Sequence, residues 1–146
     1  MSIKFKIVTP EKTVSEEEIY QATLPIEGGE VTLLPDHMPY IGALRAGEIL
    51  LRHEMNGEAT LLATSGGFVE FHGNTLVVLA DTAERAADID LARAEEAEKR
   101  AQAFMAERVH TDDEEYARVA AALQKEMARV RVARKHHSQG GQMESL

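Results

Sequence analysis

The sequence predicts a mixed, two-domain fold in which an N-terminal antiparallel β-sandwich or flattened barrel is followed by a C-terminal antiparallel αα-hairpin. Two observations predict it. Up to Ala80, apolar residues alternate in short runs separated by turn-forming residues, as in strands with one solvated face. From Asp88, apolar residues recur every three or four positions in a charged, alanine-rich sequence, which indicates helices. Because the pattern changes only once, we expect a sandwich over residues 1–86 and a helical hairpin over residues 87–136.

The first module contains several expected strands. In the first one, residues 3–8, Ile3, Phe5 and Ile7 alternate with lysines. The others cover residues 19–24, 31–34, 40–44, 48–53, 60–64, 68–71 and 75–80. Asn56 followed by Gly57 predicts a tight hairpin turn. We interpret the S-G-G sequence at 65–67 as a β-bulge or corner, because the G-x-S-x-G pattern of an esterase elbow is missing.

The second module begins after a linker over residues 81–87. Asp88 or Asp90 can cap the first helix, since a carboxylate there accepts backbone N–H groups and suits the positive helix end. The apolar stripe of this helix is thin and consists of Ala94, Ala97, Ala101 and Phe104. Alanines bury little apolar area, so we expect a weakly docked helix.

A second helix is expected from Asp112. Thr111 and Glu114 have the spacing of a capping box and follow a break in the pattern at residues 109–110. The apolar residues of this helix recur at helical spacing and are Tyr116, Val119, Ala120, Leu123, Met127 and Val130. Two narrow stripes joined by a short turn predict an antiparallel αα-hairpin. Residues 137–146 are expected to form a disordered tail.

The composition limits the classes of function. A formal net charge of -9 argues against nucleic acid as a partner. The absence of cysteine excludes disulfides, a thiol nucleophile and a cysteine-ligated metal. No apolar run approaches the roughly 20 residues that cross a bilayer, and the N-terminus lacks the pattern of a signal peptide. We therefore expect a cytoplasmic or similarly reduced location.

Few residues suggest a chemical site. The six histidines lack the spacing of metal ligands, so no metal site is expected. The Gly-Gly pairs lack the lysine and helix start of a phosphate-binding loop. No cluster of acidic and basic residues indicates an enzyme.

A basic patch is more informative. It comprises Lys125, Arg129, Arg131, Arg134 and Lys135. The patch fits either an acidic partner surface or a solvated helix end whose cations suit the helix dipole. In an antiparallel hairpin, its first members approach Glu84, Asp90, Arg93 and Arg100. Such a site combines carboxylates for an adenine amino group with cations for a polyphosphate, so a nucleotide could hold the hairpin closed.

Motifs along nearly the whole chain occur together in one family. They are V-T-P at 8–10, G-E-V at 29–31, L-P-D-H-M-P at 34–39, S-G-G-F-V-E at 65–70, L-A-D-T-A at 79–83 and I-D-L-A-R-A at 89–94. The last motif satisfies the family's ATP-binding pattern I/L-D-x-x-R-A. By these motifs the chain resembles the ε subunits of bacterial F-type (F1Fo) ATP synthases.

The resemblance implies a noncatalytic rotor subunit that couples proton translocation to ATP synthesis. Its sandwich, of about ten strands, would contact the γ subunit and the c-ring, with Glu30 and His37 in the contacting region. The hairpin would lie on the sandwich or extend along γ into the head of α and β subunits. There the basic patch would meet an acidic segment of β and inhibit ATP hydrolysis. The implied location is peripheral, on the cytoplasmic face of the bacterial plasma membrane, attached only through Fo.

The resemblance also implies ATP as a regulatory ligand, with no required cofactor. The matching positions are Glu84, Ile89, Asp90, Arg93, Ala94, Arg100, Lys125 and Arg129. Lys125 stands where ATP-binding relatives have arginine, so the charge is kept without the planar fork. Asp36 replaces the glycine expected before His37. The alternative function is a stand-alone cytoplasmic ATP-binding sensor module, which would purify alone instead of with α, β and γ subunits.

Overall fold

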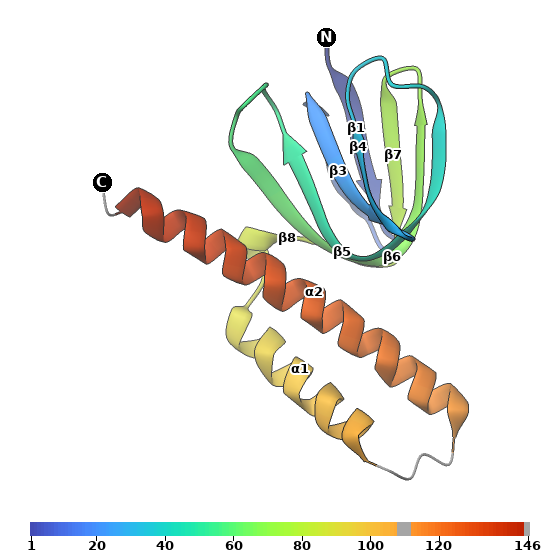
Figure 1. Cartoon of the computed structure of the whole chain (residues 1–146), viewed down its shortest axis with the longest axis vertical. Helices are drawn as coiled ribbons and strands as arrows, with labels where there is room; N and C mark the ends of the chain where they lie inside the picture. Colours follow the sequence, from blue (N-terminus) through green and yellow to red (C-terminus); the bar gives the residue numbers. More distant parts are fainter. Residues whose placement is uncertain (108–111, 145–146) are drawn as a thin grey trace.

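The computed structural model describes residues 1–107 and 112–144 and contains a β-sandwich with a two-helix hairpin (Figure 1). The strands are β1 (Ile3–Val8), β2 (Thr13–Ile19), β3 (Gln21–Ile26), β4 (Gly29–Leu33), β5 (Tyr40–Arg52), β6 (Ala59–His72), β7 (Thr75–Ala80) and β8 (Ala83–Arg85). They are followed by a 3-10 turn, η1 (Ala86–Asp88), and by helices α1 (Leu91–Ala106) and α2 (Asp113–Glu144). The predicted fold class is confirmed.

The sandwich is one sheet folded over on itself. Its strand order is β2-β1-β7-β6-β5-β3-β4, with β8 paired to β6. The long strands β5 and β6 pair with each other along almost their whole length, and each takes part in both layers. Inward side chains from both layers form one core that includes Phe5, Leu24, Leu51 and Phe71. The described chain therefore has eight strands, not ten, because β5 and β6 each cover two of the expected short strands.

Glycines permit the bend in β6. Gly66 and Gly67 have φ values of 126° and 145°, which other residues rarely adopt. A Cβ atom on Gly67 would lie 2.0 Å from the carbonyl oxygen of Leu79, so no larger residue fits without moving backbone. The predicted corner at residues 65–67 is confirmed, although the strand continues through it.

Three strand predictions were wrong in detail. The expected strand 19–24 spans the end of β2 and most of β3, because the run of glutamates in β2 conceals its alternation. The expected linker 81–87 contains β8, which is too short to show a period. The sheet is also not wholly antiparallel, since β1 pairs with β7 in parallel.

The helices begin near the expected residues. Asp90 caps α1 by accepting a hydrogen bond from the backbone nitrogen of Arg93 at 3.2 Å. Asp112 caps α2 by accepting one from the backbone nitrogen of Glu114 at 2.9 Å. The break at 109–110 and Thr111 of the expected capping box lie outside the described residues. No helix in the described part of the chain is long and apolar enough to span a membrane.

The expected disordered tail is wrong for residues 137–144, because α2 continues to Glu144. A helix that has already formed extends without a new nucleation cost, so the weak helix formers near its end are carried along. Residues 145–146 of the expected tail lie outside the described residues.

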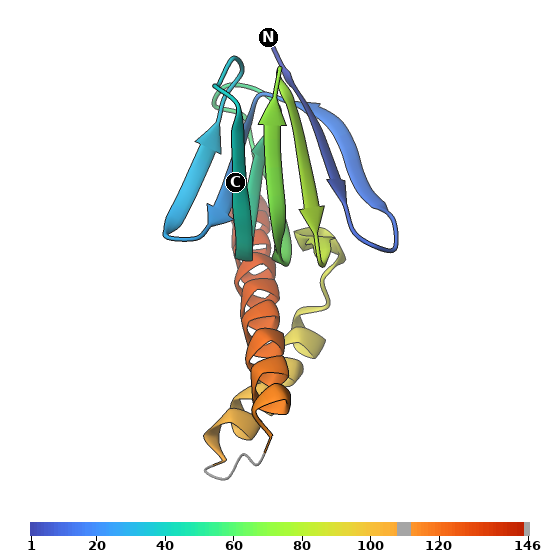
Figure 2. The same ribbon diagram turned by 90° about the vertical axis from the view of Figure 1, so that its right-hand side faces the viewer.

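The hairpin docks on the sandwich through a second apolar cluster, here called the docking seam. Figures 1 and 2 show the C-terminal half of α2 running along the sandwich, whereas the C-terminal end of α1 and the N-terminal end of α2 lie away from it. The buried members of the seam are Leu61 and Ala63 of β6, Ala86 of η1, Ile89, Ala94 of α1, and Val130, Val132 and Ala133 of α2. Only one residue of α1 is buried, in agreement with the expected thin stripe.

Candidate functional site

Arg129 of α2 forms an ionic clasp between the sandwich and the hairpin. Its Nε donates to the Glu84 carboxylate of β8 at 2.7 Å, and one terminal nitrogen donates to Glu126 at 2.9 Å. Burial lowers the pKa of the Arg129 guanidinium, but the hydrogen bonds and charges of Glu84 and Glu126 outweigh this effect and raise it. The guanidinium is therefore a permanent cation held by two carboxylates. We call these three residues the Arg129 clasp.

The structure brings together only part of the predicted ATP site. Glu84 and Arg129 are in contact, and Lys125 lines a hollow of about 320 Å³ beside Glu84. The remaining lining residues are Thr9, Glu11, Lys12, Asp81, Thr82 and Ala83. The hollow is thus lined by three acidic residues and two lysines, so it offers partners to both cationic and anionic groups.

The other predicted ATP residues lie apart from the Arg129 clasp. Ile89 and Ala94 are buried in the docking seam, where they pack the hairpin instead of lining a cavity. The Asp90 carboxylate caps α1. Arg93 and Arg100 are exposed on α1, and neither side chain forms an ion pair with a described residue. Glu126 was missed, although its position three residues before Arg129 on a helix could have indicated the pair.

Three cations of the basic patch are paired within the chain. Besides Arg129, Arg134 donates to Glu95 of α1 at 3.1 Å, and Lys135 donates to Glu48 of β5 at 2.9 Å. The pair between Glu95 and Arg134 takes the place of the helical pair with Lys99 that the spacing would allow. Lys125 and Arg131 form no ion pair within the described residues. In this arrangement most of the charge of the patch is compensated.

The proline-bracketed loop between β4 and β5 carries one of the two predicted rotor contacts. Its His37 ring hydrogen-bonds the Met38 carbonyl and meets Phe71 edge-on, with centroids 5.9 Å apart. Asp36 has a φ of 65°, which explains why glycine is expected there. Reciprocal hydrogen bonds between Asp36 and Asn74 hold the loop to the β6–β7 turn. The other predicted contact, Glu30, is exposed on edge strand β4.

An exposed apolar surface on the sandwich was missed. Strand register places Ala43, Phe68, Leu79 and Val8 side by side across β5, β6, β7 and β1. Phe68 is 64% exposed and Leu79 55% exposed, and Ile41 adds a third large apolar side chain two residues before Ala43. We call these five residues the apolar row. Neighbouring exposed apolar groups of this size are unusual unless a partner covers them. The unbroken apolar sequence 76–80 could have indicated it, because such a strand is apolar on both faces.

Within the described residues, no three histidine, aspartate or glutamate side chains gather as a metal site would require. The charged groups of this region lie on both modules, and the pairs of Glu84 with Arg129 and of Glu48 with Lys135 join the sandwich to α2.

Comparison with known proteins identifies the family. The model of the ATP synthase delta/epsilon chain β-sandwich domain matches residues 2–86, and the model of the corresponding long α-helix domain matches residues 87–134. The chain belongs to the ATP synthase delta/epsilon family. The resemblance found in the motifs is therefore confirmed.

Relatives named ATP synthase epsilon chain align over most of the chain. The protein from Dehalococcoides mccartyi is 44% identical over 133 residues, covering 91% of this chain and 93% of that protein. The protein from Herpetosiphon aurantiacus is 41% identical over 134 residues, covering 92% and 96%. Both relatives therefore share both modules of this chain.

Two solved structures share the fold at low identity. One is a chain of the Euglena gracilis mitochondrial ATP synthase, from a structure of its OSCP, F1 and c-ring. It matches with a TM-score of 0.74 and 19% identity, covering 87% of this chain and 78% of that one. The other is a chain of the Tetrahymena thermophila mitochondrial ATP synthase central stalk and c-ring. Its TM-score is 0.56 at 13% identity, with coverage of 89% and 97%.

Proposed function

We propose that this chain is the noncatalytic ε-type subunit of a bacterial F-type ATP synthase and that its helical hairpin inhibits ATP hydrolysis. The family match over both modules supports membership of the central stalk. The observation that carries the inhibitory role is the pairing of the basic patch: Arg129, Arg134 and Lys135 are each held by a carboxylate while the hairpin is docked.

The sandwich is the part that binds the rotor. Its apolar row offers an exposed apolar surface to the γ subunit, since removing Phe68 and Leu79 from water on binding lowers the free energy of the complex. The loop with His37 stands at the end of β4, held in place by the pair of Asp36 and Asn74. A rigid, exposed loop suits a contact with the c-ring.

The hairpin acts as a brake with two arrangements. In the docked arrangement, body carboxylates Glu48 and Glu84 occupy two cations of the basic patch. An acidic segment of the β subunit needs the same cations, so the two contacts exclude each other. The docking seam contains few large side chains, and a modest preference of a partner for the free hairpin shifts the balance.

ATP regulates this balance as a ligand and not as a required cofactor. Its phosphates would bind Arg129 and Lys125 at the edge of the adjacent hollow, and the Glu84 carboxylate would accept from the adenine amino group, so that ATP replaces the direct pair of Glu84 and Arg129 by contacts to both residues. Because Glu84 belongs to β8 and Arg129 to α2, a ligand between them favours the docked hairpin. The complex holds the subunit at the cytoplasmic face of the plasma membrane, where it takes part in coupling proton flow to ATP synthesis.

Neutralising the basic patch tests this function. A variant with Lys125, Arg129, Arg131, Arg134 and Lys135 changed to glutamine should raise the ATP hydrolysis rate of the assembled complex while the sandwich stays folded by circular dichroism. Neutralising Lys99 of α1 and Arg118 of α2, which are exposed cations of the hairpin outside the patch, is the control. Unchanged hydrolysis in the patch variant would remove the inhibitory role, and an increase in the control would remove its assignment to the patch.

A further inference from the structure

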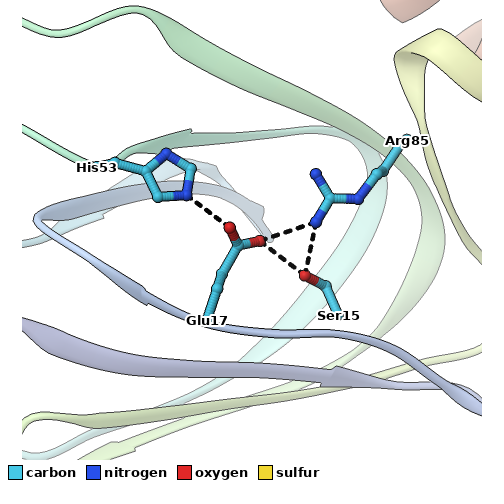
Figure 3. Close-up of polar contacts among 4 residues, drawn as sticks. All are labelled: Ser15, Glu17, His53 and Arg85. Atoms are coloured by element: carbon cyan, nitrogen blue, oxygen red, sulfur yellow. Dashed lines mark hydrogen bonds and ion pairs between the residues drawn. The ribbon is translucent and has the colours of Figure 1, made fainter.

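A polar cluster lies where the hairpin joins the sandwich (Figure 3). Glu17 of β2 is its centre: one carboxylate oxygen accepts from the Ser15 hydroxyl at 2.7 Å and from the Arg85 guanidinium at 3.1 Å. The other oxygen lies 2.5 Å from Nε2 of His53. Arg85 also donates to the Ser15 hydroxyl at 2.8 Å. We call these four residues the root cluster.

The polar groups of the root cluster are hydrogen-bonded to one another, and the cluster is partly buried. Ser15 is buried, and Glu17 points inward from an edge strand, where a charged side chain is costly unless it has partners. Burial raises the pKa of Glu17, but the hydrogen bonds from Ser15 and His53 and the charges of Arg85 and His53 lower it further than burial raises it. The neighbours therefore stabilise the ionised carboxylate.

The cluster connects strands that the backbone does not connect. β2 forms one edge of the sheet, whereas β8 pairs only with β6. That pairing involves Ala83, Glu84 and Arg85 alone, so β8 has few backbone hydrogen bonds of its own. The guanidinium of Arg85 crosses from β8 to β2 and closes the side of the sandwich between the two strands.

Anchoring changes abruptly after Arg85. The next residues, Ala86 and Ile89, are buried in the docking seam together with α1 and α2. Arg85 is tied to the sandwich by charged hydrogen bonds, and its neighbour Glu84 pairs with Arg129 of α2. Ala86 and Ile89 instead lie in the docking seam between the sandwich and the helices. A hairpin that leaves the sandwich breaks the docking seam and the pair of Glu84 with Arg129, but no contact within the root cluster involves α1 or α2.

We propose that the root cluster sets the pivot of the hairpin, so that β8 stays with the sandwich and the chain bends between Arg85 and Leu91. This inference rests on the proposed movement of the hairpin. In this proposal, the contacts among Ser15, Glu17, His53 and Arg85 keep β8 paired with the sandwich when the hairpin undocks.

Residue-resolved amide hydrogen exchange of the full chain tests the pivot. In the unmodified protein, the amides of β8 should exchange at least tenfold more slowly than those of α1. In Arg85→Gln and Glu17→Gln, exchange of β8 should accelerate at least tenfold and reach the rate of α1, with the amides of β1 and β7 unchanged. Arg85→Lys, which keeps the charge, should lie between. Glu18→Gln is the matched control, because Glu18 is the exposed neighbour of Glu17 on the same strand.

Each outcome decides the question. The pivot is overturned if β8 of the unmodified protein exchanges as fast as α1, or if Arg85→Gln and Glu17→Gln leave the exchange rate of β8 unchanged. Neither of these results bears against the proposed movement of the hairpin. If α1, α2 and β8 all exchange only as slowly as β1, the hairpin never leaves the sandwich, and the proposed function fails together with the pivot.

Discussion

Val132 of α2 gives a direct measure of how strongly the hairpin is docked. Its side chain is fully buried in the docking seam. Val132→Ala removes two methyl groups, which at about 0.8 kcal/mol each, plus a small cavity term, costs about 2 kcal/mol. At 1.4 kcal/mol per factor of ten, the population of the undocked hairpin should rise roughly 30-fold.

Amide hydrogen exchange measures this population in the isolated chain. The amides of α1 and α2 should exchange roughly 30-fold faster in Val132→Ala, because local opening determines their rate, while those of β1 and β7 keep theirs. Val119→Ala makes the same change on the same helix at a half-buried position outside the seam, and it should have a smaller effect. Equal acceleration in the helices and in the sandwich core would exclude independent undocking of the hairpin, since the two modules would then open as one unit.

Three further changes have defined results. Gly67→Ala should lower the free energy of unfolding in urea by more than about 3 kcal/mol, because the new Cβ meets the Leu79 carbonyl. Gly73→Ala has open space around it and should cost about 1 kcal/mol for its positive φ alone. Equal costs for the two substitutions would contradict the close contact at Gly67. Because the folded-state pKa of Glu17 lies below its ordinary value of 4.5, its contribution to stability is present above that value and is lost as the pH falls through the folded pKa. The stability difference between the unmodified protein and Glu17→Gln should therefore shrink as the pH falls below 4.5, and a constant difference would exclude this role. Phe68→Ser with Leu79→Ser should weaken binding to isolated γ subunit at least tenfold in calorimetry without unfolding the chain, and unchanged affinity would exclude the apolar row as the contact.

The sequence predicts most of this fold because its signals are local. Alternation in β1, the glycines at the β6 corner and the carboxylates at Asp90 and Asp112 each act within a few residues. Strand β2 was not predicted because Glu16, Glu17 and Glu18 place carboxylates on both of its faces. The inward carboxylate of Glu17 is stabilised by His53 and Arg85, which lie far along the chain. Arg85 is 68 residues away from Glu17, and the spacing of apolar residues within single elements does not reveal a contact between residues so far apart.

The candidate site was predictable only in part for the same reason. Glu84 and Arg129 were both expected near the hairpin root, and they meet there. The pairs of Glu48 with Lys135 and of Glu95 with Arg134 depend on how α2 lies against β5 and α1, which a single sequence does not encode locally. Ile89 and Ala94 belong to a ligand motif by resemblance, but in the structure both are buried in the docking seam, where they pack the hairpin against the sandwich.

In the proposed function, a hairpin docked on the sandwich cannot inhibit ATP hydrolysis. The chain has no cysteine, so thiols introduced by Glu48→Cys and Lys135→Cys are the only ones in it, at two side chains whose charged atoms lie 2.9 Å apart. Joining them with a short bismaleimide fixes the hairpin on the sandwich inside the assembled ATP synthase. We expect the joined complex to hydrolyse ATP faster than the same complex before joining. An unchanged or lower rate after joining would show that the inhibition does not depend on release of the hairpin.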